Sequence, residues 1–260
     1  MTVPGWPALR GSTAARIGLA RSGASLGTAP LLEFRLAHAK ARDAVHASLD
    51  EPALLASLPP TLVVHSRAAD RRDYLMRPDL GRHLTGESRE MLAGHAGDFD
   101  LAIVLGDGLS AQAVQRHAAA VLDALLPALG PWRLAPLVLV HGARVAVADE
   151  VAEALGARAA LILLGERPGL SAPDSLGAYL TWRPTPATTD ADRNCISNIR
   201  PAGLPYAEAA YRLHHLLDRM RAAGTSGVGL KDESGGPALV NVCESIEVET
   251  RSGGRVGDPA

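Results

Sequence analysis

Three uninterrupted apolar runs constrain the fold more than any other feature. Each of them leads through a turn into a helix-forming or irregular stretch. They cover residues 101–105, 136–140 and 159–164. Strands that are apolar on both faces must be covered on both faces, which is typical of a parallel sheet lying between helices. We therefore expect an α/β fold with a Rossmann-like, mostly parallel sheet and helices on both faces, preceded by a helical N-terminal segment.

Weaker patterns predict the remaining elements. Apolar residues at helical spacing predict helices, prolines and glycines mark their ends, and a short apolar run after two prolines predicts a further strand. Ser110 is the expected N-cap of the long alanine-rich helix. The predicted helices are 31–46, 110–129, 148–155 and 204–223, and the further strand is 61–66. Residues 144–147 are expected to extend the second apolar strand or to pair beside it. Residues 1–11 are expected to form a loose arm.

These elements divide the chain into three regions. Residues 1–95 form an N-terminal arm and helical segment, and residues 96–234 form the sheet domain. Residues 235–260 are rich in glycine and polar residues, so we expect an appended tail that is mobile beyond Thr250.

Composition excludes several classes of protein. The formal net charge of −2 argues against the basic surface that non-specific nucleic-acid binding requires. No apolar run reaches the roughly 18 residues of a membrane span, and the N-terminus lacks the features of a signal peptide. With only Cys195 and Cys243, no disulfide framework is expected. We therefore expect an intracellular protein with no nucleic-acid or membrane partner.

A glycine-rich turn follows the first apolar strand and opens the long helix. Residues 106–111 match the weak dinucleotide pattern G-x-G-x-x-A, which would make the chain a free-standing nicotinamide oxidoreductase. However, Asp107 stands where pyrophosphate oxygens would lie, and the second strand ends at His141 instead of an acidic residue. The other interpretations are a tight turn in which Asp107 supports the loop by hydrogen bonds, and a turn that lies close to some other large ligand.

Two further segments carry candidate groups. Glu166 and Arg167 lie between a strand end and a rigid Pro-Gly pair, where Glu166 either accepts hydrogen bonds from a ligand or pairs with Arg167 on the surface. Cys195 has no histidine nearby in sequence, so it is expected to be a buried or ligand-facing thiol and no nucleophile. No spacing typical of a metal site or of a catalytic triad is present, so we expect a binding domain without catalytic or metal-ligating residues.

Several segments together resemble the small (light) subunit of ethanolamine ammonia-lyase. The most specific are Glu166-Arg167-Pro168-Gly169-Leu170 and Asn194-Cys195-Ile196-Ser197-Asn198-Ile199. The resemblance spans about residues 12–234. The other segments that carry it are 15–25, 66–70, 74–82, 107–111, 174–179 and 226–234.

The resemblance implies a role in converting ethanolamine to acetaldehyde and ammonia with adenosylcobalamin. In this family the substrate site lies on the large subunit, a TIM-type barrel, while the small subunit covers the cobalamin at the subunit interface. The expected partner is therefore the large subunit, contacted by residues 1–95, and the expected cofactor is adenosylcobalamin, held by residues 96–234. The cofactor keeps its own base on cobalt in this family, which agrees with the lack of a D-x-H-x-x-G segment.

Three cobalamin contacts carry over by position, namely Val145, Glu166 and Cys195, with Asp107 and Ser110 as further candidates. Some family members have a long N-terminal extension that directs them to a bacterial microcompartment. Only about eleven residues precede the resemblance here. The resemblance therefore implies either a cytoplasmic location or a microcompartment.

Overall fold

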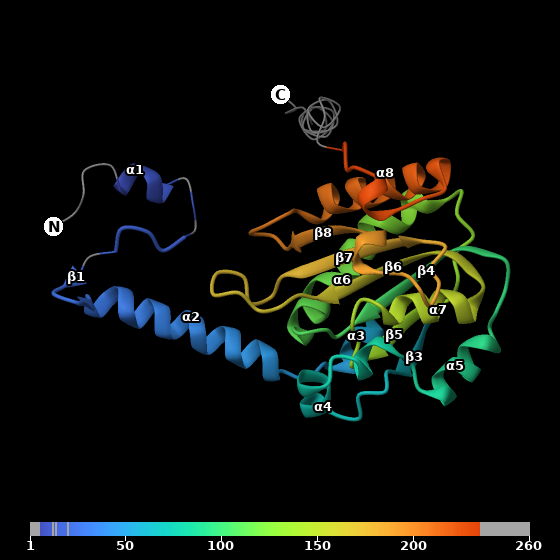
Figure 1. Ribbon diagram of the computed structural model, residues 1–260, viewed down its shortest axis with the longest axis horizontal. Coiled ribbons are helices and arrows are strands. Elements are labelled where there is room, and N and C mark those ends of the chain that lie inside the picture. The colour runs from blue at the N-terminus through green and yellow to red at the C-terminus, as the bar shows by residue number, and fades with distance from the viewer. Residues whose placement is uncertain (1–5, 12, 14, 20, 235–260) are drawn as a thin grey trace, which may run out of the picture.

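The computed structural model describes residues 6–11, 13, 15–19 and 21–234, and its centre is a six-stranded sheet (Figure 1). Four parallel strands come first in the strand order, and two antiparallel strands extend one edge. The predicted α/β class with a mostly parallel sheet is confirmed. Across the sheet the order is β3 (Thr61–His65), β5 (Leu137–His141), β4 (Phe99–Gly106), β6 (Ala157–Gly165), β7 (Leu176–Trp182) and β8 (Arg193–Ile199).

Helices cover both faces of the sheet and create two separate apolar cores. On one face, α6 (Ala111–Leu125) and α8 (Tyr206–Ala223) pack against side chains such as Leu161. On the other, α5 (Gly86–Ala93) and α7 (Val147–Leu155) pack against side chains such as Ile162. Successive residues of a strand point to opposite faces, so an unbroken apolar run contributes side chains to both cores.

The antiparallel strands β7 and β8 are absent from the sequence expectations. Their outer face carries Tyr179, Cys195 and other polar groups, so neither segment forms a long apolar run. The pairing of β7 with β6 begins after an irregular loop, a contact that sequence periodicity does not encode. The sheet is thus wider than the three apolar runs and the 61–66 strand indicate.

Most predicted helices are confirmed, and two local details differ. Residues 126–129 continue α6 as a 3-10 helix, and residues 144–146 form a turn before α7, not an extension of β5. Gly142 explains the second difference, because its φ of +68° ends the strand. Gly156 and Gly224 end α7 and α8 in the left-handed conformation, as glycines after a helix commonly do.

Apart from β3, which belongs to the sheet, the described residues up to Met76 form helices and one small hairpin. Residues 6–11 are helical, so the expected loose arm is wrong for that stretch, whereas the predicted tail 235–260 lies outside the described residues. The long helix α2 projects from the sheet domain, with the hairpin at its far end (Figure 1). The elements are α1 (Trp6–Gly11), β1 (Arg21–Ser22), β2 (Ser25–Leu26), α2 (Thr28–His46), α3 (Glu51–Ala56) and α4 (Arg71–Met76).

Among the described residues, none of the helices is both long and apolar enough to span a membrane. The same residues contain no group of three or more His, Cys, Asp or Glu side chains placed to hold a metal ion.

Candidate functional site

The chain reverses its direction across the sheet between β4 and β6. From β4 the chain passes through α6 to β5 on one side, and from β5 it passes through α7 to β6 on the other. The connection β4–α6–β5 runs over one face of the sheet and the connection β5–α7–β6 runs over the other, so the carboxyl edge between β4 and β6 is a topological switch point. Open α/β sheets bind ligands at such a switch point.

The loops after β4 and β6 are packed backbone to backbone at this point. The amide of Leu109 donates a hydrogen bond of 2.9 Å to the carbonyl oxygen of Gly165. A β-carbon on Gly108 would lie 2.3 Å from that oxygen, and one on Gly165 would lie 2.0 Å from the carbonyl oxygen of Ser110. Both glycines are therefore required by the approach of protein backbone, and the turn leaves no space beside Gly108 for a pyrophosphate group.

A cavity of about 460 Å³ opens at the switch point. Its walls combine apolar side chains with carboxylate, guanidinium and phenol groups, a mixture typical of a ligand site. It is lined by Tyr74, Leu109, Arg144, Val145, Leu164, Gly165, Glu166, Arg167 and Tyr179.

Among the described residues that line this cavity, Glu166 is the only acidic one. Its Oε2 accepts hydrogen bonds from the Ser175 hydroxyl and, at 3.2 Å, from the backbone amide of Asn198. A β-carbon on Gly177 would lie 2.9 Å from Oε1, so the carboxylate rests against a glycine of β7. Glu166 and Arg167 form no ion pair in the described part of the chain, and Oε1 has no hydrogen-bond donor there. One carboxylate oxygen thus fixes two loops while the other is free for a ligand.

Tyr179 connects the cavity to Cys195. The two residues face each other across β7 and β8, and the Cys195 thiol lies 3.3 Å from the Ser197 hydroxyl. Burial raises the pKa of Tyr179, so its hydroxyl stays protonated at neutral pH and can donate a hydrogen bond. Cys195 is exposed at its outer side, while partial burial against the sheet raises the pKa of its thiol. A raised pKa disfavours the thiolate, which agrees with a contact role for Cys195 instead of a nucleophilic one.

Tyr74 forms the wall between this cavity and a second one of about 330 Å³. Its ring lies between two guanidinium groups, 4.1 Å from that of Arg144 and 4.8 Å from that of Arg71. Its hydroxyl donates a 3.0 Å hydrogen bond to the carbonyl oxygen of Ala143, and burial raises its pKa to about 12. The Tyr74 ring is therefore held rigidly between the two cavities.

Asp107 and Ser110 have structural partners. Asp107 accepts hydrogen bonds from the amides of Gly108, Gly142 and Ala143 at 2.9, 3.1 and 3.0 Å, so it joins the turn after β4 to the turn after β5. This confirms the interpretation of Asp107 as a support of the loop. Ser110 occupies the predicted N-cap position of α6, but its hydroxyl donates to the carbonyl oxygen of Pro173 and makes no capping hydrogen bond.

The structure brings two of the three main predicted contact residues to one opening and places the third beside a residue of its wall. Val145 and Glu166 both line the cavity, and Cys195 is the cross-strand neighbour of Tyr179 in its wall. Asp107 lines the second cavity, and Ser110 is buried below the switch point. The sequence expectations missed Tyr74, Arg144 and Tyr179. Tyr74 and Tyr179 stand in the segments 74–82 and 174–179, which carry part of the resemblance.

Comparison with known proteins identifies the family. A model of the ethanolamine ammonia-lyase light chain matches residues 4–231. The chain belongs to this family. The match begins before residue 12, where the resemblance was expected to start.

Curated relatives of the family agree over most of their length. An ethanolamine ammonia-lyase small subunit from Xanthomonas campestris is 54% identical over 244 residues, which is 90% of each chain. One from Bradyrhizobium diazoefficiens is 56% identical over 87% of this chain and 90% of its own. One from Pseudomonas syringae is 49% identical over 97% of this chain and 90% of its own.

Proposed function

We propose that the chain is the small subunit of an adenosylcobalamin-dependent ethanolamine ammonia-lyase. It binds the cofactor at the carboxyl edge of its sheet, where the large subunit covers it. The relatives are named small subunits of this lyase, which implies a larger partner. The observation that carries the cofactor assignment is the cavity at the switch point, because Val145, Glu166 and the neighbour of Cys195 share it.

The residues of the cavity fit one side of a corrin ring. Cobalamin presents many amide side groups around an apolar macrocycle, so it needs both acceptors and apolar contacts. Oε1 of Glu166 is available as an acceptor, the Tyr179 hydroxyl as a donor, and Val145 and Leu109 as apolar contacts. A cavity of about 460 Å³ is smaller than the whole cofactor and open to the surface, which supports a second protein as the cover for the rest.

The residues of this chain would bind and orient the cofactor and exclude water from one side of it. Adenosylcobalamin, when bound, supplies the radical chemistry that removes hydrogen from ethanolamine. The two tyrosines are protonated at neutral pH, and Glu166 is held by two neighbouring loops. None of these groups forms an acid–base pair, which favours a substrate site on the large subunit. The proposed location is the cytoplasm or a bacterial microcompartment.

A nicotinamide enzyme is not favoured. The turn at residues 106–111 has the glycine spacing of a dinucleotide site, but Gly108 approaches the backbone of Gly165. The Asp107 carboxylate is committed to three backbone amides at the same place. A negatively charged pyrophosphate would meet both the carboxylate and filled space.

The direct test is to co-express the chain with a large subunit of this lyase and purify the complex. We expect the complex to retain a red corrinoid through gel filtration and to release acetaldehyde and ammonia from ethanolamine only with adenosylcobalamin. Each subunit alone is expected to be inactive. An assembled complex that binds no corrinoid, or a chain that binds a nicotinamide nucleotide by itself, would contradict the proposal.

Replacing Glu166 with alanine is expected to weaken cofactor retention. The change removes an acceptor for the cofactor and also leaves the amide of Asn198 unpaired. A lost hydrogen bond to a charged group costs about 1.5–3 kcal/mol, or roughly a 10- to 150-fold rise in the dissociation constant. Equilibrium dialysis of the complex with cobalamin measures this dissociation constant. Glu153→Ala, on the exposed side of α7, is the control and should bind as the wild type does.

A further inference from the structure

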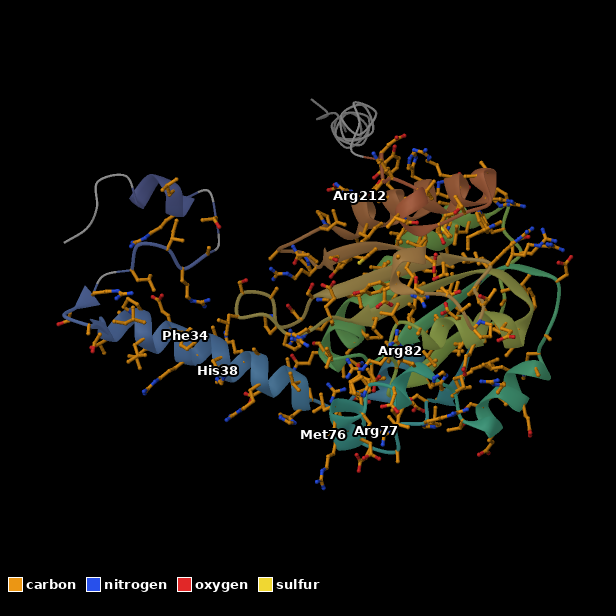
Figure 2. The ribbon with its side chains drawn as sticks, in the orientation of Figure 1. Phe34, His38, Met76, Arg77, Arg82 and Arg212 are labelled. Atoms are coloured by element: carbon orange, nitrogen blue, oxygen red, sulfur yellow. The ribbon has the colours of Figure 1, made fainter. Side chains whose placement is uncertain are left out.

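The helix α2 has few contacts with the rest of its own chain. It has 19 residues, and Ala44, in its last turn, is its only buried residue. Figure 2 shows Phe34 and His38 on the part of the helix that projects from the sheet domain. Leu32 and Leu36 are each 58% exposed, and Phe34 is 39% exposed. Protein helices are stabilised mainly by the packing of an apolar face, and this helix lacks such packing within the described residues.

The apolar residues of α2 lie on two opposite sides of the helix. At 3.6 residues per turn, Leu32, Leu36 and Ala39 share one side. Phe34, Ala37 and Ala41 share the other side. A two-helix contact between copies of the chain would bury one such stripe and leave the second exposed. A groove with two apolar walls would bury both.

Charged residues separate the two apolar stripes. Arg35 and Arg42 lie on one side with His38 between them, all three are exposed, and Arg42 lies 3.5 Å from the carboxylate of Asp43. The opposite side carries Glu33 and Lys40, whose charges cancel. A partner groove that receives this helix should therefore have acidic residues along the rim that faces Arg35.

The C-terminal end of α2, which we call its root, is joined by hydrogen bonds to the proposed cofactor site. Arg71 donates two hydrogen bonds, of 2.9 and 2.6 Å, to the carbonyl oxygen of Val45 at the end of α2. The same guanidinium donates to the carbonyl oxygens of Gly108 and Leu109 at 2.6 and 2.9 Å. Next to this root, Met76 of α4 is 73% exposed (Figure 2). A protein that covers the switch point therefore also meets the base of α2.

From these observations we infer that α2 inserts into a groove of the large subunit that has two apolar walls and one acidic rim. The inference rests on the proposed function, because it assumes that the large subunit covers the carboxyl edge. It goes further by naming the docking element of this chain, the two sides that are buried and the charge of the surface that receives them. The occupant is the large subunit and not a second copy, since two opposite apolar stripes require enclosure.

The test is the double variant Leu32→Glu/Leu36→Glu, co-expressed with a large subunit. Glutamate and leucine have similar helix propensities, so α2 should remain helical. We expect at least a tenfold loss of co-purified large subunit from the tagged chain. The matched control is Val228→Glu, which also places a carboxylate at an exposed apolar position and should assemble normally. Phe34→Glu tests the opposite stripe, and circular dichroism of each full chain checks its folding.

The outcomes separate this inference from the proposed function. Normal assembly of both the double variant and Phe34→Glu would overturn the docking assignment, even if the complex binds cobalamin. A wild-type complex that assembles through α2 but binds no cobalamin would refute the cofactor proposal and leave the docking element standing. Sedimentation of the full chain alone should show a monomer. A dimer that the double variant dissociates, with unchanged binding of the large subunit, would assign α2 to a second copy and contradict the inference.

Discussion

Replacing Gly165 with alanine is expected to destroy the switch-point geometry. The new β-carbon would lie 2.0 Å from the carbonyl oxygen of Ser110 and 2.7 Å from that of Asp107. Both neighbours are backbone atoms, so β6 and the turn after β4 must separate. Overpacking of this kind costs about 3 kcal/mol or more. Urea unfolding of the full chain should show that loss, and the assembled complex should lose most of its cobalamin.

The matched control for this change is Gly130→Ala. No atom lies within 4 Å of a β-carbon at Gly130, and its φ of −49° suits any residue. Alanine at such a position stabilises a protein by about 0.4–1 kcal/mol, because the unfolded chain loses freedom. Equal stability of the two variants would show that the loops after β4 and β6 are not closely packed.

Replacing Asp149 with alanine is expected to cause the other large effect. Arg193 and Asp149 are each 8% exposed and are joined by two hydrogen bonds of 2.7 Å, which connect β8 to the first turn of α7. Removing the carboxylate leaves a buried guanidinium with the Thr181 hydroxyl at 2.9 Å and the exposed carboxylate of Asp190 at 3.6 Å as its remaining partners among the described residues. Breaking a buried ion pair from one side costs about 3–5 kcal/mol. Thermal and urea unfolding of the full chain measure the loss.

Asp190→Ala is the control, because it removes a different carboxylate from the same arginine. Asp190 lies 3.6 Å from Arg193, but its side chain is 82% exposed. Exposed ion pairs contribute about 0–1 kcal/mol, so this variant should unfold almost as the wild type does. Similar losses for both aspartates would contradict the assignment of the Asp149 pair as the main connection between β8 and α7.

The sequence predicts the parallel centre of the fold because each of its strands is apolar on both faces. The strands β7 and β8 escape prediction, since residues such as Tyr179 and Cys195 interrupt the apolar pattern on one face. Their place in the sheet depends on pairing with β6, which is a long-range contact. A tertiary contact also replaces the side-chain cap of α6, since the Ser110 hydroxyl bonds to the carbonyl oxygen of Pro173 and accepts no hydrogen bond from an amide of the helix.

The site is predictable in part from the rule that ligands bind where strands end. That rule brings together the loops containing Glu166 and Val145, and both line the cavity. Tyr74 could not be placed in this way, because it comes from α4 and reaches the cavity by stacking between Arg71 and Arg144. The spacing of the glycine-rich turn indicates close backbone contact correctly, but the contacting group is the protein's own Gly165.

The four hydrogen bonds of Arg71 have a thermodynamic consequence for assembly. They tie the last turn of α2 and the turn containing Gly108 and Leu109 to one guanidinium, so neither segment can shift alone. Any coupling between two binding events is reciprocal: if docking of α2 tightens the hold on a ligand by some factor, the ligand tightens docking by the same factor. The same coupling free energy would then strengthen both cofactor binding and the association of the subunits.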